Sequence, residues 1–293
     1  MSDNGKTVSL ILGSGGARGL AHIGVIDTLE KEGYEIRSIA GCSMGALIGG
    51  IYAAGKLDEF EHWVRAIDKV DIVSLLDIAW QKHGLVKCDK IIEALIDLVG
   101  DRLIEDLPMP FTAVAADVRN EKEIWLSSGK LFDAIRASIS LPLFFTPVEY
   151  KHGHLIDGGV LNPVPIAPTF NDNTDLKIAV NLGGPVEKLQ RKKRAESDGD
   201  GELAGFQSRV RRFIDDLQES ILTRDETEWS AYDIADQAFD AMQGAIARQK
   251  LAVYPPDIQI QIARNACGTL EFDRADEIIA LGRDKAAEAL SAG

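Results

Sequence analysis

The stretch that decides the fold is 7–54, TVSLILGSGGARGLAHIGVIDTLEKEGYEIRSIAGCSMGALIGGIYAA. Its first part, Thr7–Leu12, is a short apolar run with β-branched residues that ends in glycines, which is typical of a buried strand. Ala17–Lys31 has apolar residues at helical spacing, and Ile36–Ala40 predicts a second strand before a helix of small residues. Because strand and helix alternate, the sequence predicts parallel strand pairing in a layered α/β sheet.

The rest of the chain continues this pattern. Further strands are predicted at Phe111–Asp117, Glu123–Ser127, Phe145–Tyr150, His154–Ile156, Lys177–Asn181 and Asp257–Ile262. Helical patterns cover most of 60–99, 131–138, 206–250 and 274–292. A polar, charged segment at 188–203 is predicted to be a mobile loop. Since no internal repeat is present, we predict a single domain over 1–293, with a core at about 7–287.

Composition excludes several classes of function. Lys and Arg number 32 against 46 Asp and Glu in 293 residues, and this net charge of −14 argues against nucleic-acid binding. No apolar run is long enough to span a membrane, and the N-terminus does not resemble a secretory signal. The three scattered cysteines, Cys42, Cys88 and Cys267, indicate buried thiols rather than disulfides or a metal site. We therefore predict a cytoplasmic protein that at most visits a membrane surface.

The clearest chemical motif is Gly41-Cys42-Ser43-Met44-Gly45, a G-x-S-x-G pentapeptide between a predicted strand and a predicted helix. A sharp turn there would present the Ser43 hydroxyl at the carboxyl end of the strand, as in a nucleophile elbow. The small glycines allow the turn to close and a substrate to approach the backbone. The alternative is that Ser43 only caps the following helix.

A second glycine cluster, Gly13-Ser14-Gly15-Gly16-Ala17-Arg18-Gly19, also joins a strand to a helix. Its amide groups can converge on an anion, either a phosphate or the oxyanion of an acyl intermediate. A dinucleotide fingerprint would need glycine at the position of Arg18, and no Lys-Ser or Lys-Thr follows to make a phosphate-binding P-loop. The nearby G-x-S-x-G motif favours the oxyanion hole, and a turn without any ligand is the alternative.

A serine nucleophile needs a base, and the histidines are badly placed for one. No histidine occurs in the 139 residues after His154, whereas the usual triad order ends with a late histidine. Asp157-Gly158-Gly159 instead follows a predicted strand, where an aspartate can take the serine proton if burial tunes its pKa. An ordinary turn is the alternative for this segment.

Together, these motifs make the chain similar to the patatin-like phospholipases, in the bacterial branch related to the esterase domain of neuropathy target esterase. The similarity is nearly continuous over Leu12–Gly50 and covers about Val8 to Ala287. Arg136–Pro142 and Phe272–Glu277 also resemble that branch. One departure is Ser14, where many members have glycine, and a small residue should be tolerated there.

The resemblance implies a three-layer α/β/α sandwich with a mainly parallel central sheet and a Ser–Asp dyad. Ser43 would be the nucleophile, Asp157 the base, and the amides of Gly15, Gly16 and Met44 the oxyanion hole. Supporting turn positions would be Gly13, Ala17, Arg18, Gly19, Gly41, Gly45, Gly158 and Gly159. Arg18 would either fix the glycine-rich turn or meet a phosphate head group. The family implies no metal and no cofactor.

The function expected from these features is a serine acyl hydrolase that cleaves lipid or other acyl esters. A non-catalytic regulatory protein and a nucleotide-binding module are the alternatives. Two segments bear on peripheral membrane contact: the basic residues among 188–194, and the apolar run Leu141–Phe145. One interpretation of each segment is a patch that faces lipid. The alternative is a solvated loop for the basic residues and a core strand for Leu141–Phe145.

Overall fold

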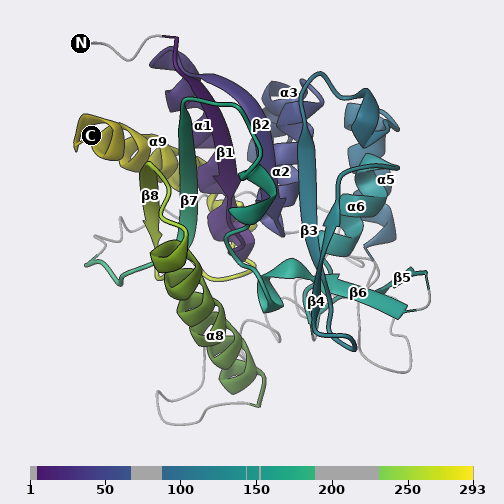
Figure 1. Cartoon of the computed structure of the whole chain (residues 1–293). Coiled ribbons are helices and arrows are strands. Elements are labelled where there is room, and N and C mark those ends of the chain that lie inside the picture. Colours follow the sequence, from purple (N-terminus) through teal and green to yellow (C-terminus); the bar gives the residue numbers. More distant parts are fainter. Residues whose placement is uncertain (1–4, 67–87, 143, 152, 189–230, 293) are drawn as a thin grey trace, which may run out of the picture.

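The computed structural model describes residues 5–66, 88–142, 144–151, 153–188 and 231–292 (Figure 1). The strands are β1 (Thr7–Leu12), β2 (Glu35–Cys42), β3 (Phe111–Asp117), β4 (Lys122–Leu126), β5 (Val148–Tyr150), β6 (Gly153–Asp157), β7 (Leu176–Gly184) and β8 (Ile258–Ala263). The α-helices are α1 (Ala21–Lys31), α2 (Met44–Ala53), α3 (Leu57–Ala66), α5 (Asp89–Val99), α6 (Leu131–Ser138), α8 (Ala231–Val253) and α9 (Ala275–Ala292). Short 3₁₀ helices are η1 (Gly16–Leu20), η2 (Ile104–Asp106), η3 (Gly158–Val160), η4 (Ala167–Thr169) and η5 (Phe272–Arg274).

The strands form one eight-stranded sheet in the order β5-β6-β3-β2-β1-β7-β8, with β4 paired to β3. Strands β1, β2, β3, β7 and β8 are parallel to their neighbours in this series. Strands β4 and β6 run antiparallel to β3, and β5 runs antiparallel to β6. The predicted mainly parallel α/β sheet is therefore confirmed.

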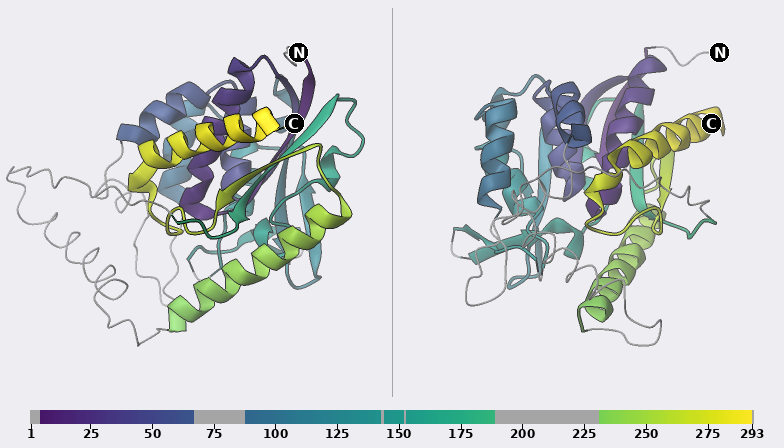
Figure 2. Two further views of the ribbon diagram at one scale, coloured as in Figure 1. Left: turned by 90° about the vertical axis from the view of Figure 1, so that its left-hand side faces the viewer. Right: turned by 180° about the vertical axis from the view of Figure 1, so that it is seen from behind.

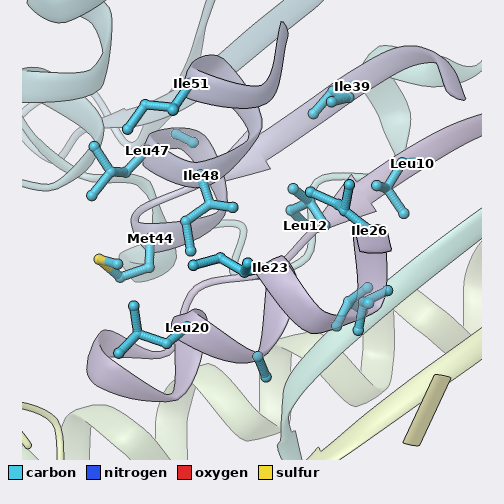
Figure 3. Close-up of a cluster of buried hydrophobic side chains, with 14 of the residues drawn as sticks. Leu10, Leu12, Leu20, Ile23, Ile26, Ile39, Met44, Leu47, Ile48 and Ile51 are labelled. Carbon is cyan, nitrogen blue, oxygen red and sulfur yellow. The ribbon is translucent and has the colours of Figure 1, made fainter. Parts of the chain in front are cut away.

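Alternating side chains of the central strands pack on opposite faces of the sheet. Leu10 and Leu12 of β1 belong to the large cluster that α1, α2 and α9 cover. Ile11 points the other way and packs with Ala247 and Leu251 of α8. Figure 2 shows α9 beside α1 and α8 well apart from both. Figure 3 shows the core of the larger cluster, with Leu10, Leu12, Leu20, Ile23, Ile26, Ile39, Met44, Leu47, Ile48 and Ile51.

Some elements differ from the predictions. The helix expected from Ala17 begins as η1 and becomes α-helical only at Ala21, because the glycine-rich turn is tightly packed. Leu141–Phe145 does not form a core strand; its described residues make a half-buried turn in which the amide of Phe145 donates to the carbonyl of Leu141. The predicted mobile loop beyond Lys188 and the predicted helix before residue 231 lie outside the described residues.

Two further predictions concern the cysteines and the membrane. The predicted buried thiols are confirmed, because all three cysteines are buried and free. In the described ranges, no helix combines the length and the apolar character that crossing a membrane requires.

Candidate active site

The turn between β2 and α2 holds Ser43 in a strained backbone conformation. Its φ is 55° and its ψ is −122°, and such conformations cost a non-glycine residue about 1–3 kcal/mol. Close packing enforces the turn, since a Cβ at Gly45 would lie 2.1 Å from the carbonyl oxygen of Leu12. The Ser43 amide donates to Ser138 Oγ at 2.9 Å, which ties the turn to α6. Ser43 is the N-cap residue of α2, but its hydroxyl makes no capping bond to the helix.

Ser43 and Asp157 are brought together although 114 positions separate them in the chain. Ser43 Oγ donates to Asp157 Oδ2 at 2.5 Å, and the amide of Gly159 donates to Oδ1 at 2.7 Å. The turn after Asp157 needs glycine, because a Cβ at Gly158 would lie 2.2 Å from the carbonyl oxygen of Val114. Both carboxylate oxygens are thus occupied, which fixes the orientation of the group toward the hydroxyl.

Strand β3 explains why these two residues meet. Strand β4 pairs with β3 from Ala113 to Asp117 and so occupies one edge, which means that β2 and β6 must share the other edge. The last residue of β2, Cys42, pairs with Val114, and Asp157 pairs with the next residue, Ala115. Ser43 directly follows β2 and therefore lies beside the end of β6.

Burial sets the acid–base behaviour of Asp157. The side chain has no exposed surface, and loss of water disfavours its charged form. This raises the pKa of Asp157 from 3.8 to about 6, while the hydrogen bonds from Ser43 and Gly159 act in the opposite direction. At neutral pH the carboxylate is still mostly ionised, but it is a stronger base than an exposed aspartate. It can therefore accept the proton of the hydroxyl beside it.

Histidines in the described part of the chain do not join this pair. His22 is buried, and its Nε2 lies 2.9 Å from the carbonyl oxygen of Gly13. Burial lowers the pKa of His22 to about 4, so the neutral ring donates this bond and supports the start of the glycine-rich turn. His62 and His154 lie on α3 and β6, without a hydrogen bond to the serine or the aspartate. Nor do the described residues contain a group of three or more His, Cys, Asp or Glu side chains that could hold a metal ion.

The glycine-rich turn after β1 leaves two successive amides without a protein acceptor. The amides on either side, at Ser14 and Ala17, donate to backbone carbonyls at 2.8 and 2.9 Å. Those of Gly15 and Gly16 have no acceptor within the described ranges. Gly16 has a φ of +55°, and a Cβ there would lie 2.5 Å from the carbonyl oxygen of Thr269. Two N–H groups are therefore available to an anion at this turn.

The start of α2 packs directly against this turn. A Cβ at Gly19 would lie 2.3 Å from the Cβ of Met44, and Leu20 and Met44 are neighbours in Figure 3. The Met44 amide is in the first turn of α2, where N–H groups have no acceptor within the helix. The amides of Gly15, Gly16 and Met44 thus belong to two segments in contact, and the positive end of the α2 dipole adds to the attraction for an anion.

Arg18 is buried and connects the glycine-rich turn to two distant elements. Its Nε donates to the carbonyl of Gly15 at 3.1 Å, and Nη1 donates to the carbonyl of Arg264 at 2.6 Å. Its guanidinium also forms an ion pair of 3.1 Å with Asp240 on α8. Because these donors are taken by the protein itself, the structure favours a role in fixing the turn over contact with a phosphate group.

One supporting segment, Arg136–Pro142, was singled out by family resemblance without a role. Ser138 Oγ accepts the amide of Ser43. Two residues later, the carbonyl of Ser140 accepts the amide of Asp157 at 2.9 Å. The segment therefore positions both members of the pair. No spacing rule could have shown this, because both contacts depend on how α6 packs against the sheet.

Comparisons with known proteins identify the family of the chain. The model of the patatin-like phospholipase family matches residues 10–170. An uncharacterized NTE family protein of Mycobacterium tuberculosis is 39% identical, over 97% of this chain and 91% of its own length. Patatin-like phospholipase domain-containing protein 6 of Mus musculus is 30% identical over 62% of this chain and 14% of its own length. Among solved structures, VipD from Legionella pneumophila is similar over 98% of this chain and 67% of its own, with 13% identity and a TM-score of 0.47. The chain belongs to the patatin-like phospholipase family, as its motifs predicted.

Proposed function

We propose that the protein hydrolyses carboxylic esters of lipids, with Ser43 as nucleophile and Asp157 as general base. The observation that carries this proposal is the 2.5 Å hydrogen bond from Ser43 Oγ to Asp157 Oδ2 within a strained strand-to-helix turn. Family membership supports a lipid-derived ester as the substrate. The free amides of Gly15 and Gly16 support stabilisation of an acyl oxyanion.

In the first half of the reaction, Asp157 accepts the proton of Ser43 Oγ while this oxygen attacks the ester carbonyl carbon. The carbonyl oxygen becomes negative and accepts hydrogen bonds from the amides of Gly15, Gly16 and Met44. As the tetrahedral intermediate collapses, the carbon–oxygen bond to the alcohol breaks. Protonated Asp157 then gives its proton to the departing alkoxide, which leaves an acyl group on Ser43.

In the second half, a water molecule takes the place of the alcohol. Asp157 removes one of its protons as the water oxygen attacks the acyl carbon, and the same amides hold the oxyanion. Collapse releases the carboxylic acid and returns the proton to Ser43 Oγ. Since one group serves as base and then as acid in each half, a pKa near neutrality suits Asp157 to both roles.

Ser43→Ala tests the nucleophile. We expect loss of hydrolysis of a short-chain p-nitrophenyl ester and of a lysophospholipid, with an unchanged far-UV circular dichroism spectrum. The matched control is Ser128→Ala, since Ser128 is exposed and lies outside the site. A fluorophosphonate probe should label the parent chain and Ser128→Ala but not Ser43→Ala. Undiminished hydrolysis by Ser43→Ala would reject the assignment, and an unreactive parent chain would favour the non-catalytic alternative.

Asp157→Asn tests the base separately. The asparagine can keep both hydrogen bonds, because its oxygen can accept the amide of Gly159 and its nitrogen can donate to Ser43 Oγ. It cannot take a proton at neutral pH, so we expect kcat for the same ester to fall by about 10²–10⁴. Full activity in this variant would mean that another group removes the serine proton.

A further inference from the structure

A groove separate from the serine–aspartate pair opens between α8 and the edge strand β8, which lies at one side of the sheet in Figure 1. Its volume is about 720 Å³, which is within the range of small-molecule sites. The groove exists because α8 covers β7 on this face through Ala247 and Leu251 but leaves β8 uncovered. Along β8 the residues facing the groove are Gln259 and Gln261, which alternate with isoleucines of the opposite core.

The charge of the groove is opposite to that of the chain. Arg248 of α8 and Arg264 after β8 both line it. None of its described lining residues is acidic, although the chain has 46 acidic and only 32 basic residues. The described lining therefore carries positive charge in a chain whose net charge is −14.

A second feature of the groove is the state of its two arginines. Arg248 and Arg264 are exposed, and neither guanidinium has a hydrogen-bond or ion-pair partner among the residues that the structure describes. Five other arginines of the described residues are paired with carboxylates, namely Arg18, Arg37, Arg65, Arg274 and Arg283. Two guanidinium groups left free in one groove are suited to bidentate hydrogen bonding of a phosphate group.

The groove has a polar part and an apolar part. The side-chain amides of Gln259 and Gln261 supply further donors next to the arginines. The apolar lining comes from Leu251 and from Val186, whose side chain is 58% exposed. An anionic head group with a short apolar extension would satisfy both parts.

We propose that this groove binds a phosphate monoester anion through Arg248 and Arg264, as a site distinct from the ester-cleaving pair. The groove adjoins a small cavity that also touches Ser14 and Arg18, and Asn181, Gly183 and Arg264 line both. A phosphate bound at Arg264 would therefore lie next to the cavity that borders the glycine-rich turn. The phosphate can come from a lipid head group or from a free phosphate compound, and the experiment below separates these sources.

Binding is measured by isothermal titration calorimetry with octyl phosphate and with inorganic phosphate, and octyl glucoside serves as the uncharged amphiphile. None of these probes contains a carboxylic ester, so the result does not depend on the proposed hydrolysis. We expect octyl phosphate to bind in a saturable way that weakens with added salt. Arg248→Ala and Arg264→Ala should each weaken it about tenfold or more. Arg119→Ala is the matched control, since Arg119 is an exposed arginine outside the groove.

Binding of inorganic phosphate with the same dependence on the two arginines would support the proposal with a free phosphate as sufficient ligand. Binding of octyl phosphate alone would support it with a phosphorylated amphiphile as the ligand. Equal binding of octyl glucoside that ignores both substitutions would overturn it, because apolar contact would then explain the affinity. Absence of binding by the parent chain, or equal weakening by Arg119→Ala, would also overturn it.

Discussion

Replacing Asp157 with asparagine is expected to stabilise the fold at neutral pH while it slows ester hydrolysis. Burial raises the pKa of Asp157 from 3.8 to about 6, so the folded protein resists ionisation of this group. The folded-state pKa of Asp157 is above that of the unfolded chain. The contribution of this carboxyl to the free energy of unfolding is therefore fully present below pH 3.8. It is lost as the pH rises through about 6, since the unfolded chain then binds fewer protons than the folded one.

The size of the effect follows from these two pKa values. Each tenfold difference in ionisation constant corresponds to about 1.4 kcal/mol, which makes the ionisation of Asp157 cost about 3 kcal/mol at pH 7. At pH 5 the same relation gives about 1.5 kcal/mol, because the folded-state carboxyl is still mostly protonated. Asparagine keeps the hydrogen bonds and removes the ionisation. Asp157→Asn should therefore exceed the parent chain in free energy of unfolding by these amounts.

Urea unfolding of both chains, followed by far-UV circular dichroism between pH 5 and pH 8, measures the difference. Asp117→Asn is a control with the opposite sign, since the side-chain hydrogen bond from Asn120 holds the pKa of Asp117 below its usual range. That substitution should reduce stability by a similar amount at every pH from 5 to 8, because Asp117 is ionised in both the folded and the unfolded chain over this range. If Asp157→Asn is less stable than the parent at pH 7, or if the difference does not vary with pH, the argument from burial is wrong.

Three further outcomes are expected. The kcat/KM for an uncharged ester should rise tenfold per pH unit up to about pH 6 and then level off, because Asp157 must be ionised; a profile without that bend would contradict its role as base. Gly158→Ala places a Cβ 2.2 Å from a carbonyl oxygen and should lower kcat/KM about a hundredfold, whereas Gly153→Ala, with its nearest neighbour at 3.7 Å, should not. Arg18→Met removes charge-assisted hydrogen bonds worth about 1.5–3 kcal/mol each, so the melting temperature should fall. In the same variant kcat should decrease by a larger factor than KM changes. An unchanged kcat would mean that Arg18 does not position the glycine-rich turn.

Local patterns were sufficient to predict several elements with their bounds. Thr7–Leu12, Phe111–Asp117 and Leu131–Ser138 were predicted as a strand, a strand and a helix, and β1, β3 and α6 have these bounds. Each has an apolar pattern that matches one secondary structure and clear residues at its ends. The predicted α/β class followed from the order of such elements, because parallel strands require the crossover connections that helices supply.

The candidate site could be nominated from sequence but not assembled. Ser43 and Asp157 were chosen because each follows a predicted strand, yet the distance between them depends on the shared edge of β3. The partner of Arg18 lies 222 positions away at Asp240, one of 46 acidic residues, so no local pattern could select it. The raised pKa of Asp157 was equally out of reach, since it results from complete burial in the folded chain.

The shared edge of β3 makes the alignment of Ser43 and Asp157 an all-or-none property. Neighbouring positions along a strand are about 3.3 Å apart and point to opposite faces of the sheet. If β6 moved by one position along β3, the carboxylate would not merely be slightly displaced; it would turn to the other face of the sheet. Gradual drift of the pair is therefore excluded. The chain between the two residues can change in length without affecting their geometry, provided that Cys42 and Asp157 keep their consecutive partners Val114 and Ala115.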